Sequence, residues 1–281
     1  MQILLRVPRR QSWKYSNQYD FSKIVFSFNP PPNFLSNKTI LITGASDGIG
    51  KCCALNFAKY GARLILLGRS KKKLETLYDL MQTAGSADTV IHPLDFTKAS
   101  EADYIQIAKS IEEQFGTIDG LLHNAGMLGA RCPIEYHPTE IWEQTFKVNT
   151  TAVFLLTKFL LPSLKSSPDA RILITSSSVG RKARGNWGAY AVSKFAVEGL
   201  MQVLAEELEK TSHIRVNTIN PGGIRSNMRR SAYPAEDPSK NPLPEVLIPL
   251  YLYLFSLESK NIHGETLNFK DFDPSKYTKS E

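Results

Sequence analysis

Short apolar runs alternate with longer amphipathic stretches along most of the chain. The runs are continuous rather than alternating, which predicts strands that are buried on both faces. They occupy residues 39–43, 62–68, 89–95, 118–124, 170–176, 214–220 and 265–269. Segments with a 3.6-residue period lie between most of the runs, and they predict helices over residues 71–83, 101–115, 139–165 and 188–209.

Strands that alternate with helices form βαβ units, which have parallel strands and right-handed crossovers. The pattern therefore predicts an α/β fold, a single-domain Rossmann-type doubly wound parallel sheet of about seven strands with helices on both faces. We expect a basic leader over residues 1–34 that is poorly ordered at its start, a folded domain over 35–270 and a C-terminal tail over 271–281. The NPPPN sequence at 29–33 is expected to mark the start of the folded domain.

Positive charge is concentrated at the start of the chain. The 281 residues include 34 basic and 27 acidic side chains, a formal net charge of +7. Residues 1–38 hold six basic side chains and one acid, so +5 of this charge lies in the first 38 residues. The charge is therefore poor evidence for a nucleic-acid-binding face. The leader superficially suits a transit peptide or a membrane-surface anchor, and we favour a disordered tail or a misplaced start codon.

Cysteine and histidine usage excludes two classes of site. The three cysteines cannot form a disulfide framework, and neither they nor the five histidines show the spacing of metal ligands. A reducing compartment fits these cysteines, so we expect a cytoplasmic protein. The longest apolar runs, 151–164 and 246–257, contain lysine or proline and fall short of the roughly 18 residues of a membrane span, so we expect buried helices there.

A glycine-rich turn follows the first predicted strand. Gly44, Gly48 and Gly50 lie where the strand at 39–43 passes into a helix, with the spacing G-x3-G-x-G. Glycines let the backbone approach a pyrophosphate, and the helix N-terminus behind them presents unpaired N–H groups to an anion. Glycines also form ordinary turns, but the strand–turn–helix context favours nucleotide binding.

The residue after the second strand indicates which dinucleotide would bind. Arg69 stands about 20 residues after the glycines, where an acid would bind the free 2′-hydroxyl of NAD. A guanidinium favours the 2′-phosphate of NADP, so we expect NADP(H) rather than NAD(H). A solvated helix start is the alternative for Arg69 and the lysines at 71–73. Asp95, at the end of the third strand, is a candidate for the adenine amino group or simply a turn residue.

Tyr190 and Lys194 are four residues apart on the helix predicted over 188–209, so their side chains project from the same face. A cation beside a phenol stabilises the phenolate and lowers the phenol pKa from about 10 towards the range of an acid–base catalyst. Taken alone, this Y-x3-K spacing is common and also fits an exposed helix pair. Together with Ser177, thirteen residues before Tyr190, it becomes informative.

In combination, these motifs resemble the short-chain dehydrogenase/reductase family over about residues 35–270. The motifs are TGASDGIG at 43–50, HNAG at 123–126 where the family usually has NNAG, Asn149, Ser177, the Y-x3-K pair and Pro221-Gly222. The strings SSSVGR and NWGAYAVSKFAVEG are most similar to the YciK-type branch of bacterial oxidoreductases. The resemblance implies a dinucleotide-binding domain that includes the active site.

The resemblance implies a catalytic set of four residues. Tyr190 would exchange a proton with the substrate oxygen, and Lys194 would lower the tyrosine pKa and hold the nicotinamide ribose. Ser177 would donate a hydrogen bond to the substrate oxygen, and Asn149 would hold a water that connects Lys194 to solvent. The expected cofactor-binding residues are Gly44, Ser46, Asp47, Gly48, Ile49, Gly50, Arg69, Asp95, Asn124, Ala125, Gly126, Tyr190, Lys194, Pro221, Gly222, Ile224 and Ser226.

Two positions depart from the common family pattern, and one residue has an expected structural role. Many members that use NADP have Arg or Lys at the position of Asp47, so its negative charge leaves the preference for NADP to Arg69. Ser226 stands where the family often has Thr, and both side chains supply a hydroxyl. Asn124 would chiefly support the sheet and the adenine ribose.

Substrate recognition is expected in the segment 225–244, which contains several arginines. A second basic cluster, with Arg181 and Arg184, lies between Ser177 and Tyr190. These cations suggest an anionic group on the substrate, such as phosphopantetheine, coenzyme A or phosphate, although solvated surface charges are the alternative that we favour.

Three functions are compatible with these motifs. The first is an NADP(H)-dependent oxidoreductase that interconverts a ketone and a secondary alcohol, and the intact catalytic set favours it. The second is a 3-oxoacyl-[acyl-carrier-protein] reductase, which shares the core and differs in the substrate segment. The third is a non-catalytic NADP-binding sensor or scaffold. We expect a small-molecule carbonyl or alcohol substrate and no nucleic acid, membrane span or metal, and the resemblance implies a homodimer or homotetramer.

Overall fold

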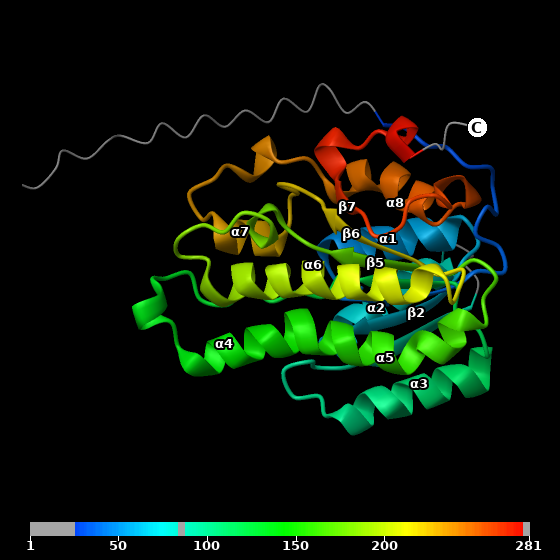
Figure 1. Ribbon diagram of the computed structural model, residues 1–281, viewed down its shortest axis with the longest axis horizontal. Coiled ribbons are helices and arrows are strands. Elements are labelled where there is room, and N and C mark those ends of the chain that lie inside the picture. Colours follow the sequence, from blue (N-terminus) through cyan, green and yellow to red (C-terminus); the bar gives the residue numbers. More distant parts are fainter. Residues whose placement is uncertain (1–25, 84–87, 278–281) are drawn as a thin grey trace, which may run out of the picture.

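The computed structural model describes residues 26–83 and 88–277, so most of the predicted leader lies outside the described residues. The described chain forms one seven-stranded sheet with helices on both faces (Figure 1). The strand order is β3-β2-β1-β4-β5-β6-β7, and every neighbouring pair is parallel. The predicted Rossmann-type α/β fold is confirmed.

The seven strands agree with the predicted apolar runs to within two residues at each end. They are β1 (Thr39–Thr43), β2 (Arg63–Gly68), β3 (Thr89–Pro93), β4 (Gly120–His123), β5 (Arg171–Thr175), β6 (Arg215–Asn220) and β7 (Thr266–Asn268). The strands β1 and β4 at the centre of the sheet are buried along their whole length, as the continuous runs predicted. The strand β3 differs, because it stands at the edge of the described sheet and exposes Val90.

Eight α-helices connect or flank the strands in the described ranges. They are α1 (Gly48–Lys59), α2 (Lys71–Thr83), α3 (Glu101–Phe115), α4 (Thr139–Phe146), α5 (Ala152–Lys165), α6 (Gly188–Glu209), α7 (Asn227–Ala232) and α8 (Ile248–Leu254). The predictions at 71–83, 101–115 and 188–209 are confirmed. The single helix predicted over 139–165 is wrong in one respect, since a π-helical turn, Lys147–Thr151, separates α4 from α5.

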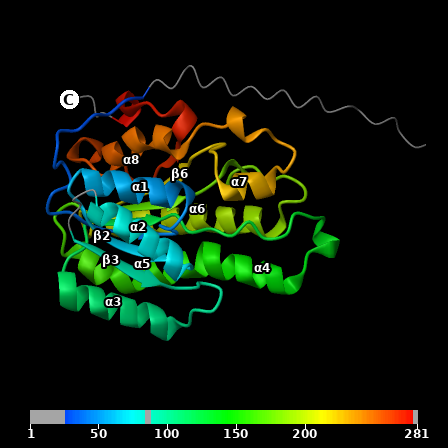
Figure 2. The same ribbon diagram turned by 180° about the vertical axis from the view of Figure 1, so that it is seen from behind.

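Two helical layers bury the two faces of the sheet. Ile40 and Ile42 point to one face, where they lie in a core with Phe57 of α1 and Leu250 of α8. Leu41 points to the other face, towards α3, α5 and α6. Figures 1 and 2 show α1 and α8 on one side of the strands and α3 and α5 on the other. The two-residue period of one central strand thus supplies both cores.

The packed part of the chain extends beyond the expected boundaries at both ends. Phe26 precedes the NPPPN sequence, yet its ring lies 5.3 Å from that of Tyr253 and 4.8 Å from that of Phe272. Phe272 also stacks on Tyr277, at 6.2 Å. Large aromatic side chains bury much apolar surface in such clusters. Residues of the expected leader and tail therefore complete the core over α8.

The described residues show neither a disulfide nor a membrane-spanning helix. Cys52, Cys53 and Cys132 are free, and the first two are buried. Within residues 26–83 and 88–277, no helix has the length and apolar content needed to cross a bilayer. The same ranges contain no group of His, Cys, Asp and Glu side chains that could hold a metal ion.

Candidate active site

A cleft of about 630 Å³ opens at the carboxyl ends of the central strands. Its walls come from the turn after β1, the segments that follow β2 to β6, and helix α7. The strand order reverses between β1 and β4, since β2 and β3 lie on one side of this pair and β5 to β7 on the other. Open α/β sheets bind ligands at such a reversal.

The glycine-rich turn forms the floor of the cleft. Gly44 and Gly48 have φ values of +64° and +50°, which L side chains rarely adopt. A Cβ at Gly48 would meet nothing closer than Ser226 Cβ at 3.6 Å, so this position is open. Gly50 does not line the cleft. Its Cα packs tightly on the turn, and a Cβ there would lie 2.4 Å from the carbonyl oxygen of Gly44. The third glycine therefore serves close packing of α1 on the turn.

The turn after β4 is tied to the glycine-rich turn. The Thr43 hydroxyl accepts hydrogen bonds from the backbone N–H groups of Asn124 and Ala125, both at 3.0 Å. The Asn124 side chain donates to the carbonyl oxygens of Thr43 and Gly44, each at 3.4 Å. These contacts fit the structural role expected for Asn124. The matching role of Thr43 was not recognised from the sequence, although this residue begins the glycine motif.

Asp47 connects three helices at the mouth of the cleft. Its carboxylate accepts hydrogen bonds from Gly48 N at the start of α1 (2.8 Å), Lys73 Nζ of α2 (2.7 Å) and Asn227 Nδ2 of α7 (2.9 Å). Partial burial raises the pKa of this carboxyl, but the hydrogen bonds from Lys73 and Asn227 outweigh that effect and hold the pKa below its ordinary value. The negative charge expected to disfavour a 2′-phosphate is therefore balanced by Lys73.

Arg69 and Asp95 lie together at the adenine end predicted for the cleft. Both line the cleft with Ser46, and the Arg69 side chain is exposed. Asp95 accepts hydrogen bonds from the backbone N–H and the hydroxyl of Thr97, at 3.0 and 2.8 Å. Asp95 is thus a turn residue that also faces the cleft, so its two interpretations are compatible.

Ser177 and Tyr190 meet inside the cleft. Tyr190 is 8% exposed, and its hydroxyl lies near enough to the Ser177 side chain to interact with it. Burial raises the pKa of Tyr190 to about 12, even though the nearby Ser177 side chain lowers it. The expected lowering of the tyrosine pKa by Lys194 is not found here. Burial dominates instead, while Lys194 Nζ donates to the carbonyl oxygen of Thr175 at 2.7 Å and lies 5.7 Å from the Tyr190 ring centroid.

Lys194 lies behind the cleft wall and is almost fully buried. Its side chain is 4% exposed and is not among the residues that line the cleft. Burial lowers the pKa of Lys194 to about 8, although the nearby carboxylate of Glu198 raises it. The ammonium form therefore still predominates at pH 7, and it remains within reach of the tyrosine.

Asn149 joins the π-helical turn to the active-site helix α6. Its side-chain oxygen accepts a hydrogen bond from Met127 N at 2.7 Å, and its amide donates to Met127 O and to Ser193 Oγ, both at 2.9 Å. Ser193 Oγ in turn donates to the carbonyl oxygen of Tyr190 at 2.9 Å. Both amide hydrogens of Asn149 are thus used, so its side chain has no donor left for the water that the resemblance implies.

The Arg181 side chain turns away from the cleft. Its guanidinium donates to Glu198 of α6 at 3.0 Å, to Asn268 of β7 at 2.7 Å and to the carbonyl oxygen of Leu267 at 3.1 Å. The hypothesis that Arg181 binds an anionic group of the substrate is therefore wrong. This arginine anchors the segment that follows Ser177, because three polar partners on α6 and β7 satisfy its donors.

The substrate segment 225–244 is held in place by its own arginines. Arg229 forms a bidentate ion pair with Glu236, with both N···O distances at 2.6 Å. Arg225 donates to the carbonyl oxygens of Ser239 and Asn241, at 3.1 and 3.2 Å. The Ser226 hydroxyl caps α7 by accepting from Arg229 N at 3.1 Å. These contacts therefore stabilise the conformation of the segment beside the cleft.

An aromatic wall stands beside Tyr190. The ring of Trp187 lies 5.7 Å from that of Tyr190 and 5.8 Å from that of Tyr233. Trp187 and Tyr233 both line the cleft. Trp142 does not, and stacks on Phe146 at 5.2 Å. Trp187 therefore belongs to the site, and Trp142 belongs to the packing of α4.

Most of the predicted site residues converge on the cleft. It is lined by Gly44, Ser46, Asp47, Gly48, Ile49, Arg69, Asp95, Asn124, Ala125, Gly126, Ser177, Tyr190, Pro221, Gly222, Ile224 and Ser226. Gly50, Asn149 and Lys194 lie behind its walls. Lys73 and Asn227 also line the cleft and were not recognised, because their importance depends on Asp47, which lies far from both in sequence.

Comparison with known proteins agrees with this geometry. Residues 38–237 match the short chain dehydrogenase family. The chain is 44% identical over 241 residues to the oxidoreductase YciK of Escherichia coli K12, which covers 86% of this chain and 95% of that protein. It is 30% identical to levodione reductase of Leifsonia aquatica, over 75% of this chain and 78% of that protein.

Solved structures show the same fold. A short chain dehydrogenase from Pseudomonas syringae superposes with a TM-score of 0.84 at 48% identity, covering 87% of this chain and 99% of that one. A short chain dehydrogenase from Shigella flexneri, complexed with NADP, superposes with a TM-score of 0.83 at 43% identity, covering 85% of this chain and all (100%) of that one.

A buried histidine behind the cleft, His123, is expected to make the stability of the fold depend on pH. His123, the last residue of β4, is buried with its Nε2 2.9 Å from the Thr157 hydroxyl. Burial, assisted by the positive charge of Lys194, lowers the pKa of His123 to about 3. The imidazole is therefore neutral in the folded protein.

We expect His123 to make the protein sensitive to acid. Its folded-state pKa lies below the ordinary value of about 6.5, so the unfolded chain binds a proton that the folded protein excludes. Stability is complete above about pH 6.5 and falls by up to roughly 1.4 kcal/mol per pH unit as the pH drops towards 3. Between pH 7 and pH 5, the free energy of unfolding of His123→Asn should fall by about 2 kcal/mol less than that of the wild type, measured by urea unfolding.

A matched control is His213→Asn, which replaces an exposed histidine. It should show the same loss of unfolding free energy as the wild type. An equal pH dependence of the wild type and His123→Asn would contradict the assignment.

Proposed function

Because the chain belongs to the short-chain dehydrogenase family of oxidoreductases, we propose that it is an NADP(H)-dependent enzyme that interconverts a ketone and a secondary alcohol. The convergence of the Ser177 and Tyr190 side chains on one cleft of about 630 Å³ carries the proposal. It places two hydroxyl groups where a single substrate oxygen could contact both.

The residues around the cleft fit a dinucleotide. The open position at Gly48 and the N-terminus of α1 would hold the pyrophosphate, since the first N–H groups of a helix have no acceptor within the helix. Arg69, with Ser46 and Lys73 beside it, would hold the 2′-phosphate of NADP. Two relatives support this choice, the Shigella flexneri protein complexed with NADP and an Escherichia coli CFT073 protein complexed with NADPH.

The bound cofactor would supply or accept the hydride, and the side chains of this chain would manage the proton. With a pKa of about 12, Tyr190 is a phenol at pH 7, the form that can protonate a ketone oxygen during reduction. Ser177 would donate a hydrogen bond to the same oxygen as negative charge develops there. The ammonium of Lys194 would stabilise the phenolate that remains, and the buried site would keep water from competing.

The other two functions receive less support from the site. A 3-oxoacyl-[acyl-carrier-protein] reductase would need cations for a phosphopantetheine. One candidate, Arg181, donates its hydrogen bonds to Glu198 and Asn268 instead. A sensor without catalytic activity would not require Ser177, Tyr190 and Lys194 to assemble around one cleft.

Removal of the phenol hydroxyl should separate catalysis from cofactor binding. We expect Tyr190→Phe to lower kcat/KM for carbonyl reduction by about 100-fold or more, because the proton donor is lost. NADPH affinity, measured by fluorescence titration, should stay within about twofold of the wild type, since the hydroxyl does not touch the pyrophosphate or adenine regions. Activity is followed as NADPH oxidation with a panel of ketones and diketones.

The control Tyr136→Phe removes the hydroxyl of a tyrosine that is 69% exposed, and it should leave kcat/KM unchanged. Full activity of Tyr190→Phe on every substrate of the wild type would refute the mechanism.

Arg69 should determine the choice of cofactor. We expect Arg69→Ser to weaken NADPH binding by roughly 10- to 100-fold, because the guanidinium contacts a phosphate that NADH lacks. NADH binding should not change. The control Lys71→Ser removes an exposed cation of the same helix start, which pairs with Glu75 at 3.6 Å, and should affect neither cofactor. Equal losses for NADPH and NADH after Arg69→Ser would exclude a 2′-phosphate contact.

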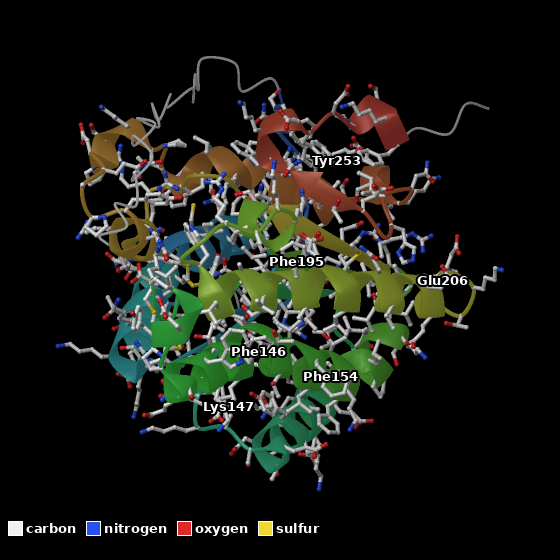
Figure 3. The ribbon with its side chains drawn as sticks, turned by 60° about the vertical axis from the view of Figure 1, so that its left-hand side comes forward. Phe146, Lys147, Phe154, Phe195, Glu206 and Tyr253 are labelled. Atoms are coloured by element: carbon white, nitrogen blue, oxygen red, sulfur yellow. The ribbon has the colours of Figure 1, made fainter. Side chains whose placement is uncertain are left out.

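An apolar face on α5 and α6 supports the proposed oligomer. Phe154, Val192, Phe195 and Val203 are between 43% and 54% exposed. Figure 3 shows Phe195 on α6 and Phe154 on α5 on the same side of the molecule. Exposed apolar patches of this kind mark protein interfaces, so we propose that a second copy covers it in a homodimer or homotetramer.

Charge on this face should separate the subunits. The double variant Phe154→Glu/Phe195→Glu should run as a monomer in size-exclusion chromatography with light scattering, because two buried carboxylates would lose hydration. The control Leu257→Glu alters a residue that is 69% exposed outside α5 and α6, and it should keep the wild-type mass. A monomeric wild type would contradict the proposed assembly.

A further inference from the structure

The part of the cleft next to Tyr190 is apolar. Val179, Trp187, Tyr190 and Ala232 are buried together, and Leu128, Met228 and Tyr233 pack against them. All of these except Val179 line the cleft. A substrate whose carbonyl oxygen meets Tyr190 and Ser177 would therefore place an apolar body against this wall.

Arg131 is held against the same wall. Its guanidinium lies 4.3 Å from the ring centroid of Trp187 and 5.2 Å from that of Tyr233. One of its N–H groups also donates to the carbonyl oxygen of Ala232, at the end of α7. Stacking on aromatic rings fixes a guanidinium plane and leaves the donors at its edge available. Arg131 is exposed and does not itself line the cleft, but it is positioned by two rings that do.

The charge of Arg131 is not neutralised by the described chain. Within residues 26–83 and 88–277, no carboxylate forms an ion pair with Arg131. Two of the arginines that the sequence suggested for an anion are engaged otherwise. Arg181 pairs with Glu198, and Arg229 pairs with Glu236. A guanidinium has five N–H donors, so Arg131 keeps several for a ligand.

We propose that Arg131 binds a carboxylate of the substrate. The inference rests on the proposed function and specifies its substrate class, a carbonyl compound with an apolar body that ends in a carboxylate. A planar carboxylate matches the fork of a guanidinium, and Arg131 presents such a fork beside an apolar wall. The apolar wall contacts the body between the two polar ends.

The test compares acids with their own esters. Straight-chain methyl-ketone carboxylates with increasing numbers of methylene groups, and the methyl ester of each, are supplied as substrates with NADPH. We expect the wild type to prefer the acid over its ester by about tenfold or more in kcat/KM at one or more chain lengths. In Arg131→Gln, this ratio should fall to about one while kcat/KM for the ester stays within about threefold. Arg131→Lys should keep part of the preference, because it retains the charge and loses the fork.

The acid-to-ester ratio is measured within each variant, so a general loss of activity does not change it. The control Arg63→Gln also removes an arginine stacked on an aromatic ring, Phe115 at 5.7 Å, at the opposite end of β2, and it should keep the wild-type ratio. NADPH affinity, measured by fluorescence titration, should be the same in all variants.

Each outcome separates the substrate inference from the proposed function. Reduction of acids and esters at equal rates by the wild type, or a preference that persists in Arg131→Gln, would overturn the role of Arg131 and leave the oxidoreductase intact. If no carbonyl compound oxidises NADPH, the proposed function fails. The acids and esters are then compared by tryptophan-fluorescence binding to the NADPH complex, where equal affinities would overturn the role of Arg131.

Discussion

The active site depends on the hydrogen bonds of one buried amide, that of Asn149. Its oxygen and nitrogen bind both backbone groups of Met127, and its second N–H binds Ser193, which holds the carbonyl of Tyr190. The turn after β4 and helix α6 are thereby fixed to one point. The amide reaches both because the π-helical turn interrupts the helix at this position, and such turns are frequent at functional sites.

Some charged side chains around the cleft form ion pairs that hold the structure together, and others form none and are available to a ligand. Asp47 pairs with Lys73, and Arg229 pairs with Glu236, so these groups hold α1, α2 and the substrate segment in place. Arg69 and Arg131 form no ion pair within the described ranges; Arg69 lines the cleft near Asp95, and Arg131 stacks on Trp187, which lines it. An arginine with free donors beside a cleft is available to an anion, which is the physical basis for both ligand proposals.

Local patterns predicted the elements well wherever the neighbours in sequence decide the structure. The strand at 39–43 and the helices at 71–83 and 188–209 have the predicted bounds, because their apolar periods match one element each. The prediction over 139–165 missed the interruption, since the partners of Asn149 lie 22 and 44 residues away. The anion-binding role suggested for Arg181 also failed, because Glu198 and Asn268 lie outside its own segment.

The sequence by itself determined the fold class, the glycine turn and the presence of Ser177, Tyr190 and Lys194, because spacing along strands and helices controls which side chains share a face. Tertiary structure decided the protonation equilibria of the tyrosine and the lysine. Burial sets the pKa of Tyr190 at about 12 and that of Lys194 at about 8, and desolvation depends on elements that are distant in sequence. It also decided which cations are neutralised, because ion pairing requires carboxylates that only the folded chain brings within reach.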